Sequence, residues 1–161
     1  MGEGGIRGYL TEALRTASRS FDLAGRSTRS ELLTYYFASL LIGIAITFSL
    51  GWFLDFEQER LATYGLKWLI SVPFPALLVR RLHDQDRSGL WAWLAFPPAA
   101  FSAAADAASV FGGIEQRISF DRATWFFYWP SLLCLIAVLA AFLMPGTAGP
   151  NRFGPDPRGR E

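Results

Sequence analysis

Long stretches without charged residues alternate with short polar segments along this chain, and the apolar stretches are long enough to cross a bilayer. Residues 32–54 carry no charge over 23 positions, and residues 123–144 carry none over 22. At about 1.5 Å per residue, a helix of either length exceeds the roughly 30 Å of a hydrocarbon core. Together with two further stretches, the pattern predicts an all-α, polytopic membrane protein, a bundle of four transmembrane helices with spans at about 32–54, 61–79, 88–106 and 123–144.

Prolines interrupt the second and third spans. Pro73 and Pro75 remove backbone N–H donors and predict a kink in the second span, whose freed carbonyls need partners from a neighbouring helix or water. The Pro97-Pro98 pair predicts two half-helices or a strong kink in the third span. Lys67 leaves the second span only 12 uncharged residues in a row, and we expect its long stem to carry the charge out to the interface.

Two polar features lie beyond the outer ends of the spans. Asp106 follows the third span, and we expect an interfacial carboxylate in water, with an intramembrane functional acid as the alternative. Residues 112–122 are of mixed charge and are expected to form an outer connection between the third and fourth spans.

The membrane domain, residues 22–148, is flanked by an N-terminal segment, residues 1–21, and a tail, residues 149–161. In the N-terminal segment, apolar residues recur every three or four positions on one helical stripe: Ile6, Leu10, Leu14, Ala17 and Phe21. Two interpretations stay open. The segment is either an amphipathic helix in the headgroup region or a frayed cytoplasmic tail.

The first span begins at a capping-box pattern. Thr28 and Glu31 stand three positions apart immediately before the apolar run. At this spacing the threonine side chain accepts from the backbone of the glutamate, and the glutamate side chain bonds back to the cap. The pattern predicts a helix start at residue 28.

Composition supports the membrane class and excludes others. A hydrophobic fraction of 52% and an aromatic fraction of 16% are high for a soluble protein of 161 residues. A net charge of +1 excludes a strongly basic nucleic-acid binder, so we expect no nucleic-acid partner. With one histidine and one cysteine, and no glycine-rich nucleotide loop, we expect no metal site and no cofactor.

Basic residues are distributed unevenly between the two sides of the predicted bundle. Eleven lie at the amino terminus (Arg7, Arg15, Arg19, Arg26, Arg29), between the second and third spans (Arg80, Arg81, Arg87) and in the tail (Arg152, Arg158, Arg160). The other side has four, namely Arg60, Lys67, Arg117 and Arg122. The positive-inside rule therefore places both termini in the cytoplasm, which an even number of spans allows.

This topology brings three polar motifs, at residues 25–29, 80–89 and 151–157, to one membrane face. Two interpretations that do not exclude each other follow. The arginines and carboxylates form an intramolecular clamp between helix ends, or they form a site for an anionic headgroup or phosphate. The candidate residues are Arg26, Arg29, Arg80, Arg81, His83, Asp84, Asp86, Arg87, Asn151, Arg152 and Asp156.

Together the three motifs resemble a bacterial inner-membrane family called domain of unknown function 805. Its pattern has a Phe-x-Gly-Arg-x-x-Arg entry, an Arg-Arg-Leu-His-Asp-x-x-Arg-Ser-Gly loop and an Asn-Arg-x-Gly-x-x-Pro tail. The resemblance covers about residues 21–157, with two extra residues in the entry between Phe21 and Gly25. It implies a small, multi-pass protein of the bacterial inner (plasma) membrane and no established activity.

We expect a non-enzymatic membrane module whose cytoplasmic Arg/Asp cluster binds anionic lipid headgroups or a protein partner, with a homo-oligomer as a further option. The alternative is a small oligomeric transporter or channel subunit, because proline-broken spans resemble discontinuous helices around a substrate path. An enzyme would need His83 as a general base oriented by Asp84 or Asp86, and no nucleophile motif accompanies them.

Overall fold

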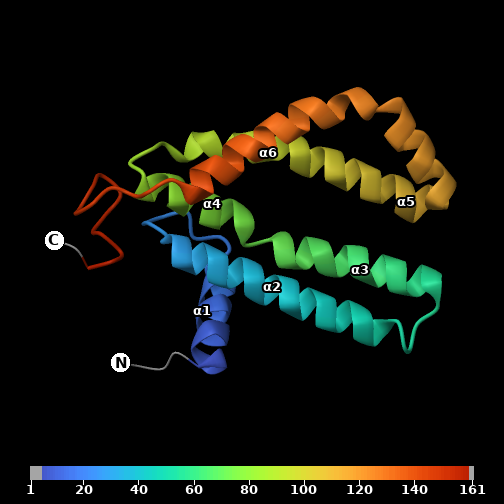
Figure 1. Cartoon of the computed structure of the whole chain (residues 1–161), viewed down its shortest axis with the longest axis horizontal. Coiled ribbons are helices and arrows are strands. Elements are labelled where there is room, and N and C mark those ends of the chain that lie inside the picture. Colours follow the sequence, from blue (N-terminus) through green and yellow to red (C-terminus); the bar gives the residue numbers. More distant parts are fainter. Residues whose placement is uncertain (1–4, 160–161) are drawn as a thin grey trace.

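Four long helical stretches run side by side along the molecule, as the computed structural model shows for residues 5–159 (Figure 1). In chain order the elements are α1 (Ile6–Ser18), α2 (Arg29–Leu50), α3 (Phe56–Ser71), α4 (Phe74–Asp84), the 3₁₀ segment η1 (Gly89–Ala95), α5 (Phe96–Ala123), η2 (Trp125–Phe127) and α6 (Tyr128–Leu143). Four stretches, 29–50, 56–84, 89–123 and 125–143, are long and apolar enough to cross a membrane. The predicted all-α architecture with four spans is confirmed.

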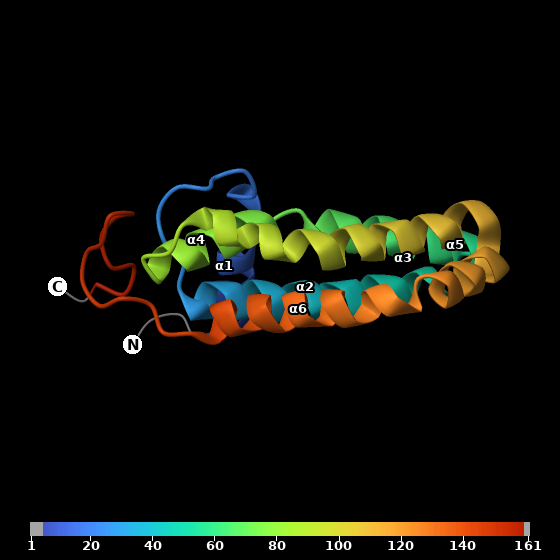
Figure 2. The same ribbon diagram turned by 90° about the horizontal axis from the view of Figure 1, so that it is seen from above.

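The segments nearest to the chain ends meet at one end of the bundle. There α1, the end of α4 and the tail after α6 lie together, and we call this the tail end and the opposite one the far end (Figure 1). Seen from above, α2 and α6 lie on one side of the bundle, and α3, α4 and α5 lie on the other (Figure 2). Segments far apart in the sequence thus converge at the tail end.

α2 begins where the capping pattern predicts, but only half of the capping box forms. Oγ1 of Thr28 accepts from the backbone N–H of Glu31 at 3.1 Å. The Glu31 carboxylate does not accept a hydrogen bond from the backbone N–H of the cap residue Thr28. It accepts from the hydroxyl of Ser27 at 2.9 Å and from Arg80 at 3.3 Å, because a guanidinium is a stronger donor than the cap N–H.

The second span breaks at its prolines, as predicted. α3 ends at Ser71 and α4 begins at Phe74, with Pro75 in the first turn of α4, where its missing N–H costs no helical hydrogen bond. Tyr35 of α2 donates its hydroxyl to the carbonyl of Ile70 beside the break, at 2.8 Å. A neighbouring helix therefore supplies a partner at the kink.

The third span is also divided, but its second part is longer than expected. η1 forms the first part, and α5 carries Pro97 and Pro98 in its first turn. Residues 112–122 form the expected outer connection between the third and fourth spans, but in helical form: α5 kinks at Gly113, and a second helical stretch runs from there to Ala123. Only Gly113, at φ +70°, departs from helical angles. The continuation is supported by an i,i+4 ion pair, in which Arg117 donates to Asp121 at 2.8 Å.

Buried apolar residues gather in two clusters near the tail end. The first consists of Ala13, Leu32, Tyr35 and Leu77, and the second of Leu78, Leu82 and Val138. α3 has no buried residue, and the buried residues of α5 are Ala105, Asp106 and Ser109. Most large apolar side chains of the spans are exposed, as expected where lipid is the solvent.

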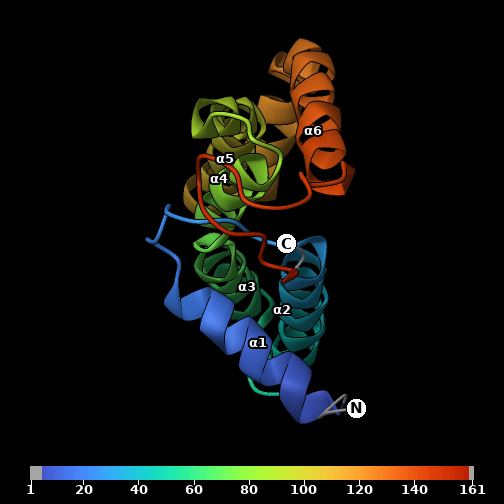
Figure 3. The same cartoon turned by 90° about the vertical axis from the view of Figure 1, so that its left-hand side faces the viewer.

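α1 is a helix that runs across the bundle axis at the tail end (Figures 1 and 3). Leu10, Leu14 and Phe21 of the predicted stripe are exposed. Ala17 is not on the exposed face, because it packs against the first apolar cluster next to Ala13. The side chain of Ile6 lies outside the described part of the chain.

Candidate functional site

The last turns of α4 place three charged side chains at the centre of the tail end. Arg80, Arg81 and Asp84 are each 0% exposed. Arg81 and Asp84 stand at i,i+3 on one helix face, and their ion pair measures 2.5 Å. Since an isolated buried charge is very costly, each of these groups needs partners from other segments.

Asp84 accepts hydrogen bonds from three arginines. Its Oδ1 accepts from Nε and Nη2 of Arg26, at 3.0 and 2.8 Å, and from Arg158 of the tail at 3.3 Å. Its Oδ2 accepts from Arg81. One carboxylate thus joins the entry to α2, the end of α4 and the tail.

Arg81 and its neighbour Gln85 cap the end of α6. Nε of Arg81 donates to the carbonyl of Phe142 at 3.1 Å, and its Nη2 donates to that of Met144. Gln85 donates to the carbonyl of Ala141. The last carbonyls of a helix have no partner inside it, so side chains from α4 satisfy those of α6.

Arg80 ties α1 to the bundle. Its Nη1 donates to the carbonyls of Arg19 and Asp22, at 3.0 and 2.8 Å, just after α1, and its Nη2 pairs with Glu31. Its Nε is buried with no hydrogen-bond partner among residues 5–159. Outside the spans, Arg19 donates to Asp22 at 2.7 Å, and this bond lowers the pKa of Asp22 below its ordinary value.

The tail wraps around the end of α4. Thr147 donates its backbone N–H to the carbonyl of Asp84 at 2.8 Å, and Asn151 donates to that of His83 at 2.9 Å. Asp156 accepts from Arg158 at 2.7 Å. A methyl group on Gly146 would overlap the Asp84 carboxylate, so only glycine allows this close approach.

We call Arg26, Arg80, Arg81, Arg158, Glu31, Asp84 and Asp156 the arginine cluster. Its members come from the entry to α2, from α4 and from the tail. The structure therefore brings together the buried members of the predicted set, Arg26, Arg80, Arg81, Asp84 and Asp156.

Other predicted residues lie at the surface around this cluster. Arg29, Arg87 and Arg152, which we call the rim, are exposed. Arg29 donates to the carbonyl of Met144 at 3.2 Å, and Arg152 pairs with exposed Asp86 at 3.1 Å. The Arg87 side chain has no hydrogen bond or ion pair within residues 5–159. The rim is thus exposed, and its member Arg87 has no side-chain partner within residues 5–159.

His83 does not form the dyad that an enzyme interpretation would require. Its Nδ1 donates to the carbonyl of Gly25 at 3.1 Å, and its ring stacks on Phe153 with centroids 3.8 Å apart. The carboxylates beside it in sequence are engaged elsewhere, Asp84 with arginines and Asp86 with Arg152. Within the described chain, no carboxylate orients the imidazole as a general base.

Sequence reasoning missed several members of the site. The sequence pattern places Glu31 in a capping box and Arg158 among the basic residues of the tail, and it does not single out Gly146 as a member of the site. Their roles depend on contacts between segments far apart in the sequence: Glu31 and Arg80 are 49 positions apart, and Arg158 and Asp84 are 74 positions apart. The one local signal was the placement of Glu31 beside an arginine-rich segment.

A second polar cluster joins α3 to α5 toward the far end. Lys67 pairs with Asp106 at 2.5 Å, and Trp68 donates to the same carboxylate at 3.0 Å. Arg60 donates to the carbonyl and the hydroxyl of Ser109, at 2.6 and 2.7 Å. The expectation that Asp106 lies in water is wrong. Its carboxylate is buried and accepts hydrogen bonds from Lys67 and Trp68 of α3.

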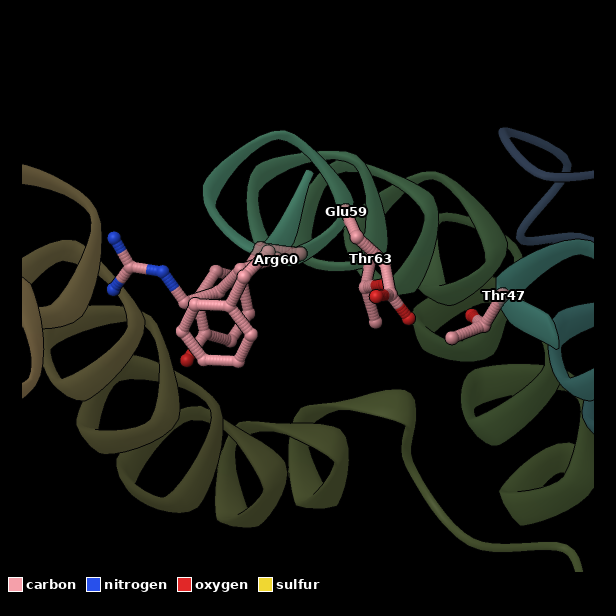
Figure 4. Close-up of a pocket in the computed structure, with 6 residues that line it drawn as sticks. Thr47, Glu59, Arg60 and Thr63 are labelled. Carbon is pink, nitrogen blue, oxygen red and sulfur yellow. The ribbon is translucent and has the colours of Figure 1, made fainter. Parts of the chain in front are cut away.

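A cavity of about 270 Å³ lies beside this cluster, between α2 and α3. It is lined by Thr47, Phe56, Glu59, Arg60, Thr63 and Tyr64. Glu59 and Thr63 point toward the space next to Thr47, whereas Arg60 points away from it toward α5 (Figure 4). Since Arg60 and Tyr64 both bond to Ser109, their polar ends are not available to a ligand in the cavity.

Residues 20–155 match the family model described as "Protein of unknown function (DUF805)". The chain belongs to the DUF805 family. This confirms the resemblance that the three motifs predicted. The matched part of this DUF805 protein includes Arg26, Arg81 and Asp84 and ends before Asp156 and Arg158.

Curated relatives cover nearly the same part of the chain. Inner membrane protein YhaI of Escherichia coli (strain K12) is 29% identical over 137 residues, which are 84% of this chain and 85% of YhaI. Inner membrane protein YhaH of the same strain is 30% identical over 142 residues, which are 83% of this chain and 85% of YhaH. No solved structure matches this chain significantly. These findings identify an uncharacterised membrane protein.

Proposed function

We propose that this protein is a non-enzymatic module of the bacterial inner membrane that binds anionic lipid headgroups through the rim arginines. In this proposal the arginine cluster is the clamp that holds the rim in place. One observation carries it: the cluster arginines bind internal acceptors, whereas Arg87 is exposed and has no side-chain partner within residues 5–159.

The burial of the cluster supports a structural role for it. A headgroup phosphate would have to displace Asp84 or the carbonyls at the end of α6 to reach Arg26 or Arg81, which are 7% and 0% exposed. Removing one partner of a buried ion pair costs about 3–5 kcal/mol. Ligand binding at the cluster itself is therefore disfavoured, and the rim is the better candidate.

The surroundings of Arg87 support a lipid as the ligand. Arg87 stands two residues before η1, where Leu90, Trp91 and Trp93 are exposed. Indole rings are enriched at the headgroup level of membranes, and a basic residue there contributes about 1 kcal/mol toward anionic lipid. A guanidinium beside exposed indoles suits a phosphate whose acyl chains lie next to the rings.

The proposal includes an orientation in which the tail end faces the cytoplasm. The excess of basic residues at that end supports it, because cytoplasmic flanks of spans carry more Lys and Arg. The relatives named inner membrane proteins support the compartment. Reporters fused to the tail and to the 51–55 connection, active in opposite compartments, would test this orientation.

The lipid site is tested by measuring phosphatidylglycerol bound to purified protein by native mass spectrometry. Arg87→Gln is expected to lower bound lipid about fivefold, which corresponds to about 1 kcal/mol, without changing the unfolding temperature. Arg122→Gln, at an exposed arginine of the far end, is the matched control and should leave binding unchanged. Equal lipid binding by Arg87→Gln and wild type would refute the site.

A further inference from the structure

α1 has two different apolar faces, only one of which is used inside the chain. Ala13 and Thr16 are 7% and 1% exposed and face the bundle, where Ala13 packs against Leu32 and Tyr35 of α2. Leu14 is 70% exposed, and Leu10 on the same side of the helix is exposed as well. The second face is therefore apolar and has nothing packed on it among residues 5–159.

The position of α1 is held by the arginine cluster. Arg80 binds the carbonyls just after α1, and the hydroxyl of Thr16 donates to Glu31 at 3.3 Å. α1 lies crosswise beside the first turns of α2 (Figures 1 and 3). Because α2 is a candidate span from its first residue, α1 lies at the depth where that span leaves the bilayer.

We propose that α1 lies in the bilayer leaflet at the tail end, with Leu10 and Leu14 at the acyl boundary and Arg7 and Arg15 at the headgroups. Both arginines are exposed, so the helix joins an apolar surface to positive charge, which suits an anionic leaflet. Its crosswise direction is that of a helix in the membrane plane, and its apolar surface continues directly into that of a spanning helix. These features favour lipid over a protein as the occupant.

The single cysteine of the chain, Cys134, allows a direct test. In a Cys134→Ser background, Leu14→Cys and Arg15→Cys each carry one nitroxide label, on full-length protein in nanodiscs containing phosphatidylglycerol. Leu14 and Arg15 are about 100° apart around the helix. The label at Leu14 is expected to collide several-fold more with oxygen, which concentrates in acyl chains, than with a water-soluble nickel chelate. The label at Arg15 should show the reverse.

Three results would overturn the proposal. Equal nickel accessibility at both labels would mean that α1 is surrounded by water. A Leu14 label that is shielded from both reagents would mean that protein covers this face, and dipolar broadening between copies would identify a second copy of this chain. The headgroup proposal is separate, because α1 does not include Arg87, and Arg87→Gln is expected to leave both accessibilities unchanged.

Discussion

The two ends of the bundle both bury charged groups, but they hold them differently. At the tail end, Asp84 is 0% exposed and accepts from three arginines that come from three segments. At the far end, Asp106 is 6% exposed, but its main partner Lys67 has a side chain 43% exposed, and Arg117 stands at 3.7 Å. The carboxylate of the first set is fully covered by partners from the protein, whereas that of the second depends on a lysine whose side chain is exposed.

The apolar core follows the same division. Both buried apolar clusters lie toward the tail end, whereas α3 has no buried residue and meets α5 through polar contacts. Helices in lipid gain little from burying apolar side chains against each other, so specific polar contacts decide where they associate. We therefore expect the tail end to be the more rigid part of the molecule and the far end to open at lower cost.

Asp84→Ala tests the comparison with the largest expected effect. The change leaves three guanidiniums close together around an empty carboxylate position, and breaking such a buried pair costs about 3–5 kcal/mol. Unfolding in detergent should show this loss, with much less monodisperse protein. Asp121→Ala, which breaks a partly exposed pair with Arg117 at the far end, is the control and should cost less than about 1 kcal/mol. Similar losses for both variants would contradict the comparison.

Gly146→Ala tests the packing at the tail end without changing any charge. The added methyl group overlaps the Asp84 carboxylate, and forcing atoms into a packed site costs about 1–3 kcal/mol. Gly65→Ala is the matched control, because Gly65 lies inside α3 with open space around its Cβ position. That variant should be neutral or stabilising by about 0.5–1 kcal/mol. A neutral Gly146→Ala would show that the tail moves away from α4 easily.

Asp106→Asn at the far end is expected to have a smaller effect than Asp84→Ala. Lys67 can turn its exposed ammonium to water once the carboxylate is gone, so we expect a loss of about 1 kcal/mol. Hydrogen exchange of α3 and α5 should rise at the far end and stay unchanged in α4. A loss as large as that of Asp84→Ala would mean that both ends are equally closed.

Much of the fold could be predicted because lipid constrains it strongly. A spanning segment must be apolar and must pair its own backbone groups, so charge-free runs such as 32–54 identify spans directly. Pro73 located the break between α3 and α4 because a proline has no N–H with which to continue the helix that precedes it. The convergence of three polar motifs followed from the topology alone.

The rest depended on partners that no local pattern identifies. Asp106 is buried because Lys67 and Trp68 of the neighbouring helix α3 donate hydrogen bonds to it. The residues around Asp106 in the sequence look like those of any segment at a membrane–water interface and do not indicate these partners. Residues 112–122 connect the third and fourth spans as predicted, but after the kink at Gly113 they are helical, and the Arg117–Asp121 pair supports that helix. The exposure of an arginine could not be predicted from the sequence either: Arg81 is 0% exposed and Arg87 is exposed, although they stand six positions apart.

The smallest expected effect concerns the exposed edge of the tail end, where Asp86 follows the C-cap residue of α4. Asp86 has φ +57°, and the next residue donates its N–H to the carbonyl of Leu82, which completes a Schellman-type helix end. Asp86→Gly relieves about 1 kcal/mol of left-handed strain and loses an exposed pair with Arg152 that contributes at most about as much. Its net change in unfolding free energy should therefore be close to zero.

Asp86→Ala loses the pair without relieving the strain, so it should be about 1 kcal/mol less stable than Asp86→Gly. If the two variants were equally destabilised by several kcal/mol, the exposed edge would be as closed as the arginine cluster, and burial would not be what distinguishes the cluster from the rim.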